Sequence, residues 1–156
     1  MKIVLDSCKK EKLGEIVRDL KWPSFRSKQL YSWIFKKYVS NFSQMTNLSK
    51  DMRENLEKLY QLSSLDVISE QTSKERNTMK WLSKLEDGAQ IETVLMNHSF
   101  GNSLCISTQA GCAMNCSFCA SALNGLERNL TAGELHGQVR LAQNKLMEKG
   151  EKLDHL

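Results

Sequence analysis

Three cysteines at a fixed spacing constrain this chain more than any other feature. Cys112, Cys116 and Cys119 lie in the run GCAMNCSFCA, separated by three and then two residues. Three thiolates on one short loop can hold three irons of a cubane cluster, and because such clusters usually have four protein ligands, one iron stays open to a small molecule. The spacing therefore predicts a tight loop that carries a reactive [4Fe-4S] cluster.

Two other uses of three cysteines match the sequence less well. A structural zinc site prefers four closed ligands, often as two Cys-x2-Cys pairs, whereas this loop has one pair, and His98 and His136 lie outside it. A disulfide needs an oxidising compartment, and the N-terminal run MKIVLDSCKK has too short an apolar segment for a secretory signal. No apolar stretch is long enough to span a membrane. We therefore expect a cytoplasmic protein with reduced thiols and no membrane association.

An aromatic residue, Phe118, directly precedes the third cysteine. The pattern Cys-x3-Cys-x-aromatic-Cys resembles the signature of the radical S-adenosylmethionine enzymes. The resemblance implies that the open iron chelates S-adenosylmethionine and that Phe118 lies near its adenine. It also implies that an electron from the cluster generates a 5′-deoxyadenosyl radical.

The sequence on both sides of the cysteines narrows this resemblance. Between Asp87 and Glu134 the chain contains a DG turn, IETVLM, SLCISTQAGC and RNLTAGE. These motifs are similar to those of the RlmN family, dual-specificity methyltransferases that act on C2 of adenine in 23S rRNA and tRNA. Upstream, FRSKQLYSWIFKK at 25–37 and MTNLSKDMRENL at 45–56 resemble the helices of the same family. The resemblance covers nearly the whole chain.

The resemblance also implies roles for two residues outside the cysteine loop. Cys105 matches the cysteine that resolves a covalent protein–RNA adduct in this family, although from its own residues a buried strand cysteine is the plainer interpretation. Glu92 matches a glutamate proposed there as the proton acceptor. Otherwise Glu92 is a solvent-facing strand residue, because Ile91, Thr93 and Leu95 can share the opposite face.

The family's pattern continues beyond the last residues of this chain. A strand leading to a Gly-Glu-Pro-type motif and a late cysteine that accepts the methyl group have no counterpart before Leu156, and Cys8 belongs to no motif. We therefore expect an N-terminal fragment of such an enzyme, inactive by itself. One alternative is a Cfr-like enzyme that methylates C8 of adenine. Another is a truncated chain that binds RNA or a cluster and catalyses nothing.

The charge of the chain is uneven. Residues 1–60 carry 13 Lys and Arg against 7 Asp and Glu, and the remainder carries 9 against 11. We expect the basic part to contact rRNA and tRNA. The candidate phosphate contacts are Arg26, Lys28, Lys36 and Lys37. We also expect a monomer that receives electrons from a donor such as flavodoxin.

Aromatic residues in the basic part have two interpretations. Trp22, Tyr31 and Trp33 have flat rings on which RNA bases can stack. Alternatively they form a core, and for Trp33, which shares a helical face with Leu30 and Ile34, the core is favoured.

Apolar periodicity predicts an α/β fold that begins with a small helical domain over residues 1–62. The basic charge and the resemblance imply that this is an accessory domain for RNA binding. Helices are expected at 9–20, at 24–38 and from Ser49. A β-hairpin linker is expected over 63–98. Its strands are predicted at 65–70, 78–85 and 89–96, with Asp87-Gly88 as a turn.

Residues 99–156 are expected to begin a radical S-adenosylmethionine domain, an incomplete, partial TIM-type barrel. A strand at 104–108, the cysteine loop, and a helix that starts at the capping box Thr131-x-x-Glu134 and ends near Gly150 make its first βα unit. A parallel barrel needs several such units before its core closes. We therefore expect apolar faces to stay uncovered, and the chain to be poorly soluble or partly disordered after about residue 100.

Overall fold

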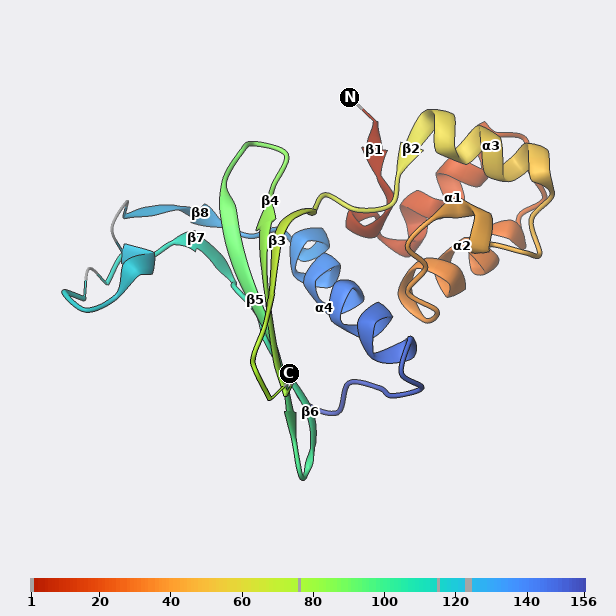
Figure 1. Cartoon of the computed structure of the whole chain (residues 1–156). Helices are drawn as coiled ribbons and strands as arrows, with labels where there is room; N and C mark the ends of the chain where they lie inside the picture. Colours follow the sequence, from red (N-terminus) through yellow and green to blue (C-terminus); the bar gives the residue numbers. More distant parts are fainter. Residues whose placement is uncertain (1, 76, 115, 123–124) are drawn as a thin grey trace. The chain divides into compact units, whose positions relative to one another are not determined.

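The computed structural model describes residues 2–75, 77–114, 116–122 and 125–156. It divides the chain into two compact units, Met1–Ser64 and Leu65–Leu156 (Figure 1). The first unit is helical and the second combines strands with one long helix, so the chain is mixed α/β. The separation of a linker at 63–98 from a domain at 99–156 stays a prediction.

The first unit contains the three predicted helices, with shorter bounds. Its elements are β1 (Ile3–Val4), η1 (Leu5–Ser7), α1 (Lys10–Asp19), α2 (Arg26–Phe35), η2 (Phe42–Gln44), α3 (Lys50–Leu59) and β2 (Tyr60–Gln61). Helix α3 begins where predicted, because the side chain of Ser49 accepts a hydrogen bond from the Met52 amide. Strands β1 and β2 pair in parallel.

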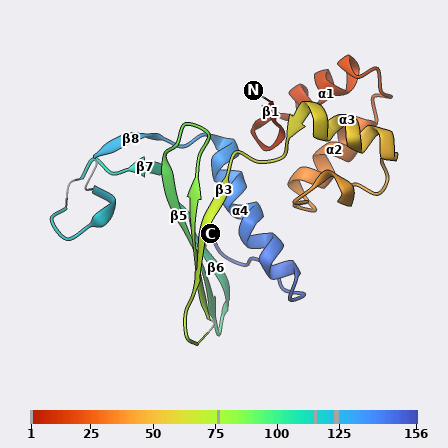
Figure 2. The same ribbon diagram turned by 45° about the horizontal axis from the view of Figure 1, so that its top comes forward.

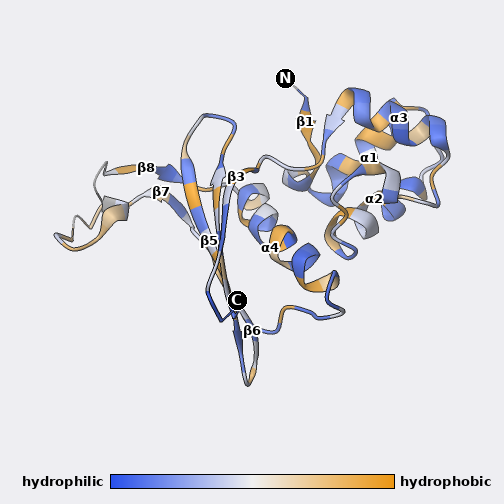
Figure 3. Ribbon diagram, in the orientation of Figure 1, coloured by the Kyte–Doolittle hydropathy of each residue, from blue (hydrophilic) through white to orange (hydrophobic). Residues whose placement is uncertain are grey.

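A single apolar cluster holds the first unit together. Apolar and polar segments alternate along its helices (Figure 3), so each helix buries one face. The cluster includes Leu13 of α1, Leu30 and Ile34 of α2, and Leu56 of α3, all fully or almost fully buried. Trp33 belongs to the same cluster, which confirms the core interpretation for this residue.

The second unit is built on a four-stranded antiparallel sheet in the order β3-β4-β5-β6. Its elements are β3 (Asp66–Thr72), β4 (Thr78–Lys84), β5 (Gln90–His98), β6 (Gly101–Cys105), β7 (Gln109–Gly111), η3 (Ala120–Ala122), β8 (Leu126–Asn129) and α4 (Ala132–Met147). Helix α4 lies along one face of the sheet, and the β7–β8 pair extends away from it as an arm (Figures 1 and 2).

Helix α4 begins and ends as predicted. The capping box is formed, because Thr131 accepts from the Glu134 amide and the Glu134 side chain accepts from the Thr131 amide. The helix ends at Met147, and Gly150 follows with a φ of 72°, a left-handed conformation that suits glycine.

Two expectations for the residues after 100 are wrong. The strand expected at 104–108 runs over Gly101–Cys105, and its pairing with β5 is antiparallel, so it adds a fourth strand to the hairpin sheet. The apolar faces are also covered in the described residues. Ala142 and Leu146 of α4 pack against Trp81, Leu95 and Leu104 of the sheet, because the hairpin strands supply the surface that the helix needs.

Candidate active site

Strand β5 presents different residues to its two sides. Ile91, Thr93 and Leu95 are buried, whereas Glu92 is exposed on the other face. This alternation is the one that the sequence predicts. The Glu92 carboxylate accepts a 2.9 Å salt bridge from Lys80 Nζ on β4. Glu92 therefore has a solvent-accessible carboxylate on the face opposite α4.

Cys105 ends strand β6 on this same face. It pairs in register with Val94, while its neighbour Leu104 is buried in the cluster that contains α4. Its thiol is free and exposed, so the interpretation as a buried strand cysteine is wrong. Because Val94 and Glu92 are two residues apart on one strand, Cys105 and Glu92 lie on one face of the sheet.

The cysteine loop projects from the arm, between β7 and β8. Gly111 ends β7 with a φ of 72°, and a Cβ placed on it would lie 1.9 Å from the Gly125 carbonyl oxygen. The Cys112 amide donates to that same oxygen over 3.0 Å. Gly111 is therefore required for the close approach that forms the neck of the loop.

The three loop cysteines are accessible free thiols. Cys116 is exposed, and Cys112 and Cys119 are half-buried. Backbone bonds shape the loop: the Cys119 amide donates to the Cys116 carbonyl over 3.1 Å. Three thiols on one exposed loop have the chemistry of a cluster donor set. Among the described residues no group of three potential ligands is gathered at metal-binding distance.

The ring of Phe118 is 91% exposed, and Met114 is 77% exposed on the same loop. Apolar side chains exposed to this degree mark a surface that has room for a ligand or a partner. This position is compatible with contact to a bound cofactor, and the adenine contact stays a prediction.

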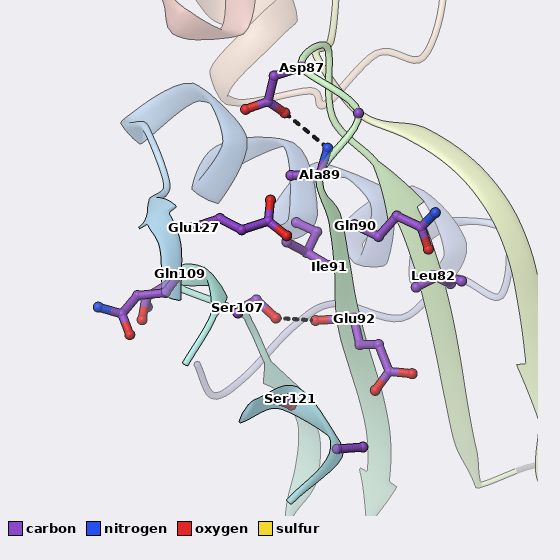
Figure 4. A pocket seen from close by; sticks show the side chains of 14 residues that line it. Leu82, Asp87, Ala89, Gln90, Ile91, Glu92, Ser107, Gln109, Ser121 and Glu127 are labelled. Atoms are coloured by element: carbon purple, nitrogen blue, oxygen red, sulfur yellow. Dashed lines mark hydrogen bonds between the residues drawn. The ribbon is translucent and has the colours of Figure 1, made fainter. Parts of the chain in front are cut away.

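A hollow of about 830 Å³ lies between the sheet and the arm. Figure 4 shows Leu82, Gln90 and Glu92 of the sheet on one side and Gln109 and Glu127 of the arm on the other. The residues that follow the last cysteine, Ala120 and Ser121, also line it. The hollow thus brings the strand of Glu92 and the end of the cysteine loop to one space.

Arg128 of β8 joins three segments around this hollow. Its Nε donates to Asp87 Oδ2 over 2.6 Å, and its two terminal nitrogens donate to the two oxygens of Glu134 over 2.9 and 2.7 Å. These bonds connect the β4–β5 turn, the arm and the start of α4. The bonds from Arg128 lower the pKa of Asp87 and of Glu134 below their ordinary values, and in Asp87 the Ala89 amide contributes as well.

The candidate RNA contacts in the first unit differ in their exposure and in the bonds that they form within the unit. Lys28, Lys36 and Lys37 are exposed on α2 and just after it. The Lys37 ammonium lies 3.6 Å from the centre of the Trp33 ring. One Arg26 nitrogen donates to Gln29 Oε1 and to the Asn47 carbonyl, so part of this guanidinium is engaged within the unit.

Sequence reasoning missed three residues that organise the site, namely Gly111, Arg128 and Gln138. Arg128 stands in the RNLTAGE motif, so the motif was found without the function of its arginine. A buried glutamine such as Gln138, which is 0% exposed, has no distinctive sequence signal. Its partners are 31 and 45 residues away along the chain.

Comparison with known proteins shows what the chain is similar to. Residues 4–62 match the family model "Ribosomal RNA large subunit methyltransferase N-terminal domain". A protein of Halalkalibacterium halodurans named "Probable dual-specificity RNA methyltransferase RlmN" is 49% identical over 131 residues, which are 84% of this chain and 36% of that protein. Over these residues the chain is similar to proteins named RlmN.

Other matches show the same similarity. A protein of the same name from Bacillus velezensis is 50% identical over 129 residues, covering 83% of this chain and 35% of the relative. The crystal structure of a radical SAM methyltransferase from Sphaerobacter thermophilus aligns with a TM-score of 0.88 at 35% identity, covering 97% of this chain and 44% of that one. The chain spans about a third of the length of its curated RlmN relatives. Within its described part, no helix is long and apolar enough to cross a bilayer.

Proposed function

We propose that this chain supplies the first part of the active site of a radical S-adenosylmethionine RNA methyltransferase that acts on C2 of adenine in rRNA and tRNA. One observation carries the proposal. The hollow beside Glu92 is also lined by Ala120 and Ser121, which directly follow Cys119. The proposed proton acceptor and the end of the proposed cluster loop therefore border the same space.

Cys112, Cys116 and Cys119 are the residues that would hold a [4Fe-4S] cluster. Their accessible thiols fit it, because three thiolates leave one iron open. When bound, the cluster supplies the electron for reductive cleavage of S-adenosylmethionine. Phe118, which is exposed, would pack on the adenine.

Glu92 and Cys105 act on the RNA side of the reaction. Glu92 has an exposed carboxylate, which can accept the proton that leaves adenine C2. Cys105 has an exposed thiol on the same face of the sheet and resolves the covalent adduct between RNA and the methyl-carrying cysteine. The target adenine has to leave its stack to reach this face.

The proposed barrel begins with a crossover from β6 through α4. Residues after α4 return beside β6: Ser103 and His155 form a parallel bridge, the Leu104 amide donates to the His155 carbonyl, and the His155 amide donates to the Asn102 carbonyl. A strand, a helix and a parallel return are the repeating unit of an α/β barrel. This geometry supports a partial radical S-adenosylmethionine barrel in the second unit.

The first unit is proposed to bind structured RNA. Its exposed Lys28, Lys36 and Lys37 are available for phosphate oxygens. We further propose that the enzyme is a cytoplasmic monomer. It would receive electrons from a donor such as flavodoxin.

Anaerobic reconstitution of the 156-residue chain with ferrous iron and sulfide tests the cluster. We expect about four irons and four sulfides per chain and, after reduction, an electron paramagnetic resonance spectrum that changes when S-adenosylmethionine is added. Cys112→Ala should lose the iron. Cys8→Ala is the matched control, because Cys8 is buried outside the loop, and it should retain the iron. Equal iron in both variants would refute the cluster assignment.

Methyl transfer is measured on a protein of the relatives' length that contains these residues. The expected product is 2-methyladenosine in rRNA and tRNA, and Cys105→Ala should accumulate a covalent protein–RNA adduct. An 8-methyladenosine product would instead assign the Cfr-like activity. A protein that holds the cluster but transfers no methyl group would favour the non-catalytic alternative.

A further inference from the structure

The hydrogen-bonded ladder between β5 and β6 stops before it reaches Glu92. Its last pair is Val94 with Cys105, and beyond it the chain turns away towards the arm. Continuing the antiparallel register by two residues would place Ser107 opposite Glu92. The relative position of Glu92 and the segment after Cys105 is therefore not fixed by strand pairing.

One buried side chain replaces the missing ladder. Gln138 of α4 accepts from Thr93 Oγ1 over 2.8 Å and from the Ser107 amide over 2.9 Å, both at its Oε1. Its Nε2 donates to the Ser107 carbonyl over 2.9 Å and to the Glu134 carbonyl over 3.4 Å. Gln138 therefore binds the amide and the carbonyl of Ser107 and the hydroxyl of Thr93, which is the residue after Glu92.

A further hydrogen bond joins Ser107 directly to the backbone of Glu92. Ser107 Oγ donates to the Glu92 carbonyl oxygen over 2.7 Å. Ser107 is thus bound to Glu92 directly and, through Gln138, to Thr93. It also lies two residues after Cys105, at the start of the path to the cysteine loop.

We propose that Gln138 is a positioning residue that fixes Ser107, and with it the segment that leads from Cys105 to the cysteine loop, relative to Glu92 from behind the sheet. The catalytic meaning of this placement rests on the proposed function, whereas the placement itself does not depend on it. Gln138 faces the side of the sheet that packs on α4, so it contacts neither the hollow nor an RNA base. It acts through Thr93 and Ser107.

Only a side chain that both accepts and donates satisfies this position. An apolar residue of similar size would leave the buried Thr93 hydroxyl and the partly buried amide and carbonyl of Ser107 without this partner, which is costly. A protonated glutamate keeps an acceptor and a donor at the same distance from the backbone, whereas an ionised one loses the donor.

The test uses the full chain with Cys112, Cys116 and Cys119 changed to Ser, so that no cluster forms. Two cysteines then remain. Cys8 is buried, and burial raises the pKa of its thiol, so it reacts slowly and Cys105 dominates the reaction with 4,4′-dithiodipyridine. A failure of the cluster assignment does not affect this measurement.

In this parent, Gln138→Leu should speed hydrogen exchange of the Ser107 amide by at least tenfold and raise the Cys105 reaction rate by at least threefold. Gln143→Leu is the matched control, because it makes the same change on the same helix at a side chain that binds the Leu153 amide instead. It should leave both rates within twofold. Unchanged rates in a folded Gln138→Leu, or equal changes in Gln143→Leu, would overturn the proposal.

Gln138→Glu keeps the test decisive if Gln138→Leu does not fold. Burial raises the pKa of a carboxyl and so favours its protonated form, and at pH 5 both rates should match those of the parent at the same pH. Ionisation of this glutamate at pH 8 should raise both rates above those of the parent at the same pH. The neighbouring Glu134 stays ionised at both values, because the bonds from Arg128 lower its pKa. Failure of the pH 5 rescue would also overturn the proposal.

Discussion

The two units of this chain are stabilised by different means. In its described part the first has one apolar cluster of 14 buried residues, from the three helices and the segments that flank and connect them. Among its described residues the second has two apolar clusters of five buried residues each, and it buries Thr93, Asn102, Glu134 and Gln138, each of which forms side-chain hydrogen bonds. Apolar contacts tolerate small shifts, whereas hydrogen bonds do not. The second unit, which carries Glu92 and the cysteine loop, is thus the one in which hydrogen bonds between buried polar groups help to fix the geometry.

The largest effect is expected from the apolar core of the first unit. Leu30 is 0% exposed, and Leu30→Ala should lower the free energy of unfolding of that unit by about 2–5 kcal/mol, because it removes buried methyl groups and leaves a cavity. Urea unfolding followed by tryptophan fluorescence measures the loss. The control Leu59→Ala, at a side chain that is 48% exposed, should cost less than about 1 kcal/mol.

The same variant tests whether the units are independent. Amide signals of residues 65–156 should stay at their positions in Leu30→Ala, because those residues have their own clusters. Loss of these signals together with those of the first unit would show one cooperative structure and remove the basis of the comparison.

The next effect is expected at Arg128. Its removal in Arg128→Leu leaves the Glu134 carboxylate, whose side chain is 7% exposed, without its bidentate partner. We expect a loss of roughly 1–3 kcal/mol, below the value for a fully buried pair because the guanidinium is partly exposed. Arg128→Lys should recover only part of the loss, since an ammonium cannot bind both carboxylate oxygens in the same way. Thermal unfolding of the second unit measures both.

Acid should act on this network in a defined direction. The folded-state pKa values of Asp87 and Glu134 are lowered, so their stabilisation is present above the unfolded pKa and is lost as pH falls through the folded pKa. The second unit should therefore lose stability below about pH 4. Arg128→Leu should flatten this dependence. An unchanged slope would exclude Arg128 as its cause.

A smaller and more local effect is expected at the neck of the cysteine loop. In Gly111→Ala the new Cβ would meet the Gly125 carbonyl at 1.9 Å, and the φ of 72° is unfavourable for alanine. We expect a cost of about 1–3 kcal/mol, confined to the arm. The measurement is loss of protection of the Cys112 amide in hydrogen exchange. Gly88→Ala, at a positive φ with open space around it, is the control for strain without a clash.

The sequence was informative wherever a short pattern determines a structure. The Thr131–Glu134 capping box, the Ser49 cap and the alternation around Glu92 depend on residues a few positions apart, and all three are confirmed. The end of the strand that was predicted at 104–108 depends instead on a residue far away in the sequence. Ser107 binds Gln138, 31 residues later, in place of a neighbouring strand, so local preference could not reveal where β6 ends.

The covering of α4 could not be predicted for a related reason. Each apolar segment was recognised, but the antiparallel pairing of β6 with β5 decides that the hairpin sheet and not a further strand covers the helix. The motif residues were identified in the same partial way. RNLTAGE pointed to a family, while the three-way connection made by Arg128 to Asp87 and Glu134 is a property of the folded chain.

The smallest loss of stability is expected when Lys80 is replaced. This variant tests whether the ion pair on the exposed face of the sheet contributes less to stability than the buried polar network does. Lys80 and Glu92 form a 2.9 Å pair, with side chains that are 39% and 55% exposed. Exposed ion pairs contribute about 0–1 kcal/mol, so Lys80→Ala should lower the free energy of unfolding by less than about 1 kcal/mol. A loss as large as that of Arg128→Leu would show that Glu92 is held as part of the structure. A small loss leaves its carboxylate free for chemistry, because Glu92 is then held by its backbone, through the pairing with Leu82 of β4 and the bond from Ser107 Oγ to its carbonyl oxygen.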